Sequence, residues 1–123
     1  MENPPEALSK RTKRFALRVI KLVSSLPKTP EAQSIGRQVF RSGTSVGANY
    51  RESLRARSKS ENASKMSLSL MELEETAYWL ELIEEGQIAQ NPEINSLQSE
   101  ANELAAIFVT MIKKVREGAA RGL

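Results

Sequence analysis

A chain of 123 residues is long enough for one domain with a buried core and too short for two. It contains no Cys, no His and no Asp, so all fifteen acidic residues are Glu. These absences exclude disulfides, thiolate chemistry and the commonest general base and metal ligand. Aromatic residues are scarce while Ala and aliphatic residues are abundant, which favours a helical bundle over a β-sandwich or barrel.

The net charge of +3 is unevenly distributed along the chain. Residues 1–65 contain fourteen Lys or Arg against five Glu, whereas residues 66–123 contain four against ten. Either the basic half binds a polyanion, or the two halves complement each other within and between subunits. The first ten residues contain no apolar run of a signal sequence, and no window reaches the length of a membrane span. We therefore expect a cytoplasmic protein with no membrane partner.

Apolar periodicity and helix-ending residues predict two helices in the first half. The first covers about residues 10–26 and ends at Pro27. The second begins after Thr29, a good N-cap, and covers about residues 30–57 with a proline at its first position.

Two further helices are predicted in the second half. One begins at the capping box that joins Ser58 to Glu61 and ends at Gly86 as C-cap. The other begins at Asn91 as N-cap and ends near Glu117. Three short links between long helices predict an all-α, up-down-up-down antiparallel four-helix bundle. The bundle domain is expected over residues 10–117, between flexible tails at 1–9 and 118–123.

The stretch RSGTSVGANYRE, residues 41–52, resembles a turn or a phosphate-binding loop in composition. Placed on a helix, however, the second element separates into three faces. One is an apolar stripe of Ile35, Val39, Val46 and Tyr50; the next is a line of small residues, Gly36, Gly43 and Gly47; the opposite face holds Arg37, Arg41, Arg51 and Arg55. No strand precedes the stretch, and neither nucleotide-binding glycine pattern is present. We therefore predict a helix whose glycines allow close packing against another helix.

Two polar residues, Asn49 and Glu52, border this face. A polar pair beside a core usually fixes the register of neighbouring helices through hydrogen bonds. A contact with a partner is the alternative.

The third predicted helix has an apolar stripe beyond the one that its own core requires. The additional stripe consists of Leu68, Met71, Trp79 and Leu82, interrupted by Glu75. A helix that is apolar nearly all round is expected to be buried all round, and one four-helix monomer does not cover both sides of its helix. The stripe predicts a subunit interface with Trp79 as its anchor. Alternatively, Trp79 and Tyr78 close one end of the core.

Two segments together resemble a known bacterial family. They are QVFRSGTSVGANYRESLRARSKSE and, after it, EETAYWLELIEEGQI. This order is similar to that of the four-helix-bundle proteins first described as encoded in intervening sequences of large-subunit ribosomal RNA genes. The resemblance covers about residues 12–117 and departs from the family pattern at Asn62, where an aromatic residue is expected.

The resemblance implies a left-handed up-down bundle that assembles into a homopentameric ring, with no catalytic activity and no cofactor. A related branch comprises the accessory proteins of diversity-generating retroelements, which are pentameric, basic and associated with nucleic acid and a reverse transcriptase. We therefore expect a homo-oligomeric scaffold that binds RNA or DNA phosphates through its arginines, with Arg14 and Arg18 of the first helix adding to the four of the second. No aromatic residue lies among the arginines, so sequence readout is not expected.

Three other functions have less support from the sequence. A module that docks an unidentified protein partner, such as an enzyme encoded nearby, is the main alternative. Di-iron and helical-ribonuclease chemistry both require His and are excluded. A lone Glu acting as a base is the remaining enzymatic alternative, with Glu52 or Glu75 the first to test, but nothing in the sequence activates them, so no catalytic residue and no metal ligand is assigned. Binding to a membrane surface through the basic first helix is disfavoured, because the core needs the apolar stripe of that helix.

Overall fold

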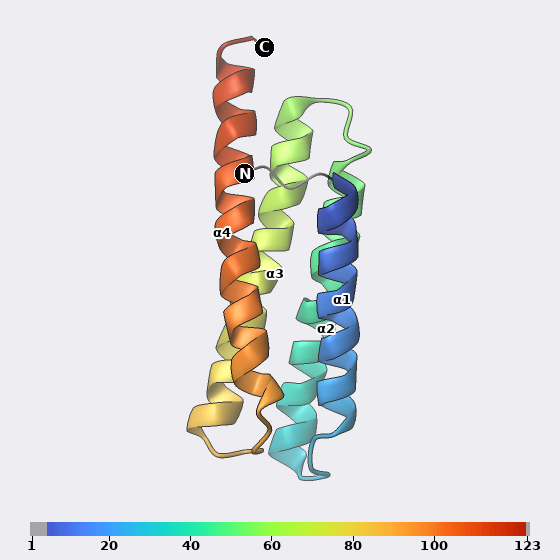
Figure 1. Ribbon diagram of the computed structural model, residues 1–123, viewed down its shortest axis with the longest axis vertical. Helices are drawn as coiled ribbons and strands as arrows, with labels where there is room; N and C mark the ends of the chain where they lie inside the picture. Colours follow the sequence, from blue (N-terminus) through green and yellow to red (C-terminus); the bar gives the residue numbers. More distant parts are fainter. Residues whose placement is uncertain (1–4, 123) are drawn as a thin grey trace.

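The computed structural model describes residues 5–122, and within that range every regular element is an α-helix. The four helices are α1 (Pro5–Ser24), α2 (Pro30–Ser53), α3 (Lys59–Glu85) and α4 (Glu93–Ala120). Successive helices run in opposite directions along one long axis (Figure 1). The predicted antiparallel four-helix bundle is confirmed. Packing joins α1 and α3 each to α2 and α4 but not to one another within the described residues, so α1 and α3 occupy diagonal corners.

Local hydrogen bonds explain where three of the helices begin. The Thr29 hydroxyl accepts a bond from the Ala32 N–H, and the Ser58 hydroxyl accepts one from Glu61. The Glu61 carboxylate in turn accepts a hydrogen bond from the Arg57 N–H. In a standard capping box it would accept from the N–H of the N-cap residue, Ser58, so the observed bond lies one residue earlier. At the start of α4 the N-cap residue is Pro92 rather than the predicted Asn91. The side-chain oxygen of Asn91, one residue earlier, accepts a hydrogen bond from the Glu93 N–H at 2.9 Å. These side chains satisfy amide groups that have no partner inside the helix.

Several predicted helix ends need correction. The first helix begins at Pro5 rather than residue 10, because Leu8 is buried in the core and holds this turn in place. Thus residues 5–9 of the predicted tail are helical, while residues 1–4 lie outside the described range. The second helix ends at Ser53 rather than at residue 57. The fourth continues to Ala120, through part of the other predicted tail.

The core lies along the bundle axis and is built from all four helices. Its largest fully buried side chains include Tyr50, Phe15 and Phe108. The Tyr50 and Phe108 rings meet edge to face, with centroids 5.6 Å apart, and join α2 to α4 across the bundle. Where the family pattern predicts an aromatic residue, the Asn62 side chain instead donates a hydrogen bond to the Ser53 carbonyl at the end of α2.

Buried hydroxyls link α2 to α3 at two levels. The hydroxyl oxygens of Ser42 and Thr76 lie 2.7 Å apart, at hydrogen-bonding distance, and both side chains are fully buried. One level away, the buried Ser69 hydroxyl donates to the Val46 carbonyl at 2.8 Å. Because each bond requires one alignment of the two helices, these pairs specify the α2–α3 register.

Ion pairs dominate the seam between α1 and α4. Arg11 donates two hydrogen bonds of 2.8 Å to the Glu100 carboxylate, and this bonding raises the pKa of the Arg11 guanidinium. Arg18 donates at 2.6 Å to Glu93 and also bonds the Ser96 hydroxyl. The acidic second half of the chain therefore neutralises part of the basic first half inside one molecule.

Candidate nucleic-acid interface

The segment of residues 41–52 is helical throughout, despite its loop-like composition. Its hydroxyl side chains bond back to the helix: Thr44 donates to the Phe40 carbonyl at 2.7 Å, and Ser45 donates to the Arg41 carbonyl at 2.6 Å. Both hydroxyls therefore donate to carbonyl groups of the preceding turn and are not available to bind a phosphate.

The glycines of this helix face α1. A Cβ atom at Gly43 would lie 2.8 Å from a γ-carbon of Val19, and one at Gly47 would lie 3.0 Å from the Thr12 hydroxyl oxygen. Both distances are shorter than ordinary contacts, so α1 occupies the space that a side chain would need. This close approach holds α2 in one rotation about its axis, with its opposite face directed outward.

The outward face of α2 carries the arginines predicted for phosphate binding, and they divide into two kinds. Arg41 is already bound, because its guanidinium lies 2.7 Å from the Glu75 carboxylate and 3.3 Å from that of Glu72. Arg37, Arg51 and Arg55 are exposed and form no ion pair with any carboxylate of residues 5–122. Arg37 and Arg51 project from the helix, and Arg55 lies in the turn that follows it.

The candidate arginines of α1 divide in the same way. Arg18 is engaged by Glu93 in the α1–α4 seam, so it is not a free cation. Arg14 is exposed and forms no ion pair within the described range. Four of the six predicted arginines thus retain a charge that the described part of the chain does not neutralise.

A shallow groove of about 360 Å³ runs between α1 and α2 beside these arginines. Two cationic residues line it, Lys13 from α1 and Arg51 from α2. The other lining residues are small: Thr12, Ala16, Thr44, Gly47 and Ala48. Its shape follows from the glycine packing, because short side chains on both helices leave a depression along their contact. The groove presents cations above a surface that a polymer backbone can approach closely.

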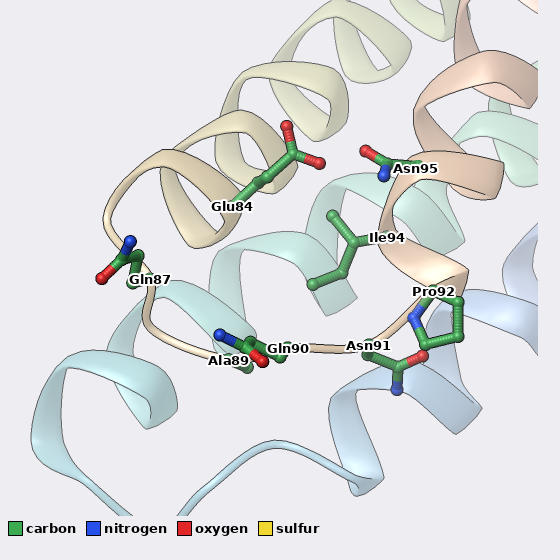
Figure 2. A pocket seen from close by; sticks show the side chains of 8 residues that line it. All are labelled: Glu84, Gln87, Ala89, Gln90, Asn91, Pro92, Ile94 and Asn95. Carbon is green, nitrogen blue, oxygen red and sulfur yellow. The ribbon is translucent and has the colours of Figure 1, made fainter.

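A second hollow, of about 600 Å³, lies where α3 turns into α4 (Figure 2). Glu84, Gln87 and Ile94 are among its lining residues, and no Lys or Arg lines it. The Asn91 side chain at its edge is occupied, since its oxygen accepts from the Glu93 N–H and its nitrogen donates to the Ser25 hydroxyl at 3.3 Å. This hollow therefore lacks the charge that an anion would require.

The outer face of α3 exposes part of the predicted interface stripe. Leu68 and Met71 are 41% and 55% exposed, whereas Leu82 and Trp79 are only partly exposed. Trp79 packs against the core, and its indole nitrogen is buried without a hydrogen-bond partner within the described residues. The exposed aromatic residue is its neighbour Tyr78, at 53%, with the two ring centroids 5.2 Å apart. The sequence prediction did not include Tyr78 in the stripe, although its spacing of seven residues from Met71 was available.

The two residues predicted to fix the register do not bond each other. Glu52 is exposed and lies 3.8 Å from the Lys65 ammonium of α3, a weak surface ion pair. Asn49 is half-buried, and its side chain makes no hydrogen bond within residues 5–122. The polar contacts that align α2 with α3 are those of Ser42 and Ser69 instead.

Within residues 5–122, none of the helices is long and apolar enough to cross a membrane. In the same range, no group of three or more Glu side chains is arranged to hold a metal ion.

The fold and its surfaces define a class: a small antiparallel four-helix-bundle protein with an arginine-bearing outer helix face. The chain belongs to the 23S rRNA-intervening sequence protein family, whose model matches residues 7–110, so the resemblance seen in the sequence is confirmed. It is similar to a solved structure from Bacteroides thetaiotaomicron, described as a protein with unknown function from the S23 ribosomal protein family. The two are 30% identical with a TM-score of 0.79, over 85% of this chain and 97% of that one. No curated protein matches.

Proposed function

We propose that this protein is a non-enzymatic, homo-oligomeric scaffold whose α2 face binds the phosphate backbone of RNA or DNA. The observation that supports this function is the set of arginines without a carboxylate partner, namely Arg14, Arg37, Arg51 and Arg55. Three acids of α4 pair with α1, and two acids of α3 pair with Arg41, yet these four cations remain exposed. A guanidinium presents several donors in a geometry that matches phosphate oxygens.

The function proposed is backbone binding without sequence readout. The prediction that no aromatic residue lies among the arginines needs correction, because Phe40, between Arg37 and Arg41, is 45% exposed. One ring does not stack successive bases, so readout of the sequence by stacking is still not expected. Arg51 also lines the groove between α1 and α2. Each subunit contributes few cations, and a ring of subunits strengthens a weak site by avidity. The family's description as 23S rRNA-intervening sequence proteins makes structured RNA the first ligand to test.

Fluorescence anisotropy tests this function, with a labelled RNA duplex, the same sequence as DNA, and both single strands, across a salt series. The expected result is binding at low salt that weakens as salt rises, with a slope of about −0.9 per neutralised phosphate for duplexes and −0.7 for single strands. Replacing Arg37, Arg51 and Arg55 with alanine should reduce the slope by about 2 to 3. The matched control is Lys113→Ala on α4, which removes an exposed charge far from α2 in the sequence and should leave binding unchanged. Absence of binding at low salt would reject the proposal.

The alternative is a module that docks a partner protein, and the exposed apolar residues of the surface favour it. Leu68, Met71 and Tyr78 on α3, with Leu17 on α1, are all more than 40% exposed. If the anisotropy experiment detects no nucleic acid while the protein remains oligomeric, the apolar residues that the assembly leaves exposed become the place to look for a protein partner.

A further inference from the structure

Three acidic residues that have no ion pair within the described residues lie on the outer face of α3. Glu74, Glu81 and Glu85 are exposed and form no salt bridge with residues 5–122. They alternate with the two most exposed apolar residues of the helix, Met71 and Tyr78. The order is Met71, Glu74, Tyr78, Glu81, Glu85, with spacings of three and four residues. This spacing places all five on one stripe, which we call the acidic stripe.

A stripe of opposite charge runs along the outer face of α1. Lys10, Lys13, Leu17 and Ile20 follow the same alternation of three and four residues, and Lys21 lies beside Ile20. Leu17 is 57% exposed and Ile20 is 37% exposed. The three lysines are exposed and form no ion pair within the described residues. We call these five residues the basic stripe.

From these two stripes we infer that the acidic stripe of one copy packs against the basic stripe of the next copy. This inference rests on the self-association that is part of the proposed function, and it names the surface that receives α3. Both stripes have the spacing by which helices form coiled-coil-like seams. Both combine apolar residues with charges of one sign, and the signs are opposite.

The register of such a seam can be derived from the sequence positions. In one chain α1 and α3 run in the same direction (Figure 1), and all copies in a cyclic ring share one orientation, so the seam is parallel. Aligning Tyr78 with Leu17 then aligns Glu74 with Lys13. The same register brings Glu81 level with Ile20 and beside Lys21. Two ion pairs thus flank one central apolar contact.

The contact joins unlike surfaces, which decides how assembly proceeds. Because α1 and α3 occupy diagonal corners, one neighbour does not cover both stripes of a chain. Every copy therefore binds two others, and association continues until a ring closes. The outward arginines of α2 lie between these corners and remain available for phosphates.

Charge reversal tests the inference by sedimentation velocity, with circular dichroism to verify that each variant is folded. The pair Glu74→Lys/Glu81→Lys and the pair Lys13→Glu/Lys21→Glu should each reduce the oligomer to single chains. Combining all four substitutions restores opposite charges in every contact, so this variant should recover the wild-type sedimentation coefficient. The control matched to Lys13→Glu/Lys21→Glu is Arg37→Glu/Arg55→Glu, which makes the same charge change on α2 and should remain oligomeric while losing RNA binding.

The possible outcomes separate this inference from the proposed function. If Lys13→Glu/Lys21→Glu stays oligomeric, α1 is not the receiving surface, and this inference fails although self-association stands. If the four-substitution variant stays monomeric, the charges are not paired as described, and it fails too. If the wild-type protein itself sediments as a single chain, self-association fails and the inference with it, while the RNA titration independently reports on the arginines.

Discussion

Replacing Gly43 with alanine tests whether the close approach of α1 to α2 is required. The new methyl group would lie 2.8 and 2.9 Å from the two γ-carbons of Val19 and 3.2 Å from its Cβ. Ordinary carbon contacts are near 3.5 to 4.0 Å, so the helices would have to separate by roughly 0.7 Å. Val19 is fully buried, and a β-branched side chain in a helix has one strongly preferred rotamer, so it does not rotate away.

Two opposing terms set the size of the effect. Overpacking of a core costs about 1 to 3 kcal/mol, while alanine in place of glycine favours a helix by about 1 kcal/mol. We expect Gly43→Ala to lose about 1 kcal/mol of unfolding free energy. Gly36→Ala is the matched control in the same helix, because the one short contact of its new methyl group is the flexible end of Leu26, at 2.9 Å, while Val23 lies at an ordinary 3.6 Å. There the propensity gain should dominate, with a rise of about 0.5 to 1 kcal/mol.

Urea unfolding followed by circular dichroism measures both variants, at a single protein concentration because self-association would shift the apparent stability. Adding Val19→Ala to Gly43→Ala should cost less than the two single changes together, since the new methyl group then fills the space that the valine left. The reasoning would be refuted if Gly43→Ala were as stable as Gly36→Ala.

Three further predictions concern buried polar groups. Ser42→Ala should lower the unfolding free energy, measured in urea, by about 1 to 2 kcal/mol. Because Ser42 and Thr76 share a hydrogen bond, the double variant with Thr76→Val should lose less than the sum of the two single losses. Additive losses would contradict the shared bond. Burial raises the pKa of Tyr50 above 10.0, so the unfolded chain loses this proton first and stability should fall as pH rises above about 10. Tyr50→Phe should flatten that decline in a pH series, and an unchanged decline would assign it to another group. Trp79→Phe deletes a buried donor that lacks an acceptor, so its unfolding free energy should stay within about 1 kcal/mol of wild type; a loss of about 3 kcal/mol or more would mean that the indole N–H is bonded.

The four helices were predictable because their determinants are local. A proline, a capping hydroxyl or an amide acts within one turn of chain, and the capping bonds of Thr29 and Ser58 form where the sequence indicated. For α4 the prediction was off by one residue, because the N-cap is Pro92 rather than Asn91. The start of α1 was not predictable in this way. Its first turn depends on the burial of Leu8 against other helices, and short-range signals do not record that contact.

In the candidate surface, too, some features follow from the local sequence and others from contacts between helices. Periodicity was sufficient to place Arg37, Arg41 and Arg51 on one side of a helix, because a helical wheel requires only sequence spacing. Whether each arginine is free depends on where α3 places its carboxylates, and Glu72 and Glu75 bind Arg41 alone of the three.

The sequence by itself thus determined the secondary structure, the direction of each helix and the side of α2 that bears positive charge, since these follow from interactions between residues at most a few positions apart. Only the tertiary structure decided which charges are neutralised, which hydroxyls align α2 with α3, and that Tyr78 rather than Trp79 is the exposed ring. The physical reason is that ion pairs, buried hydrogen bonds and solvent exposure depend on residues from different helices. Their proximity is set by the packing of the whole bundle.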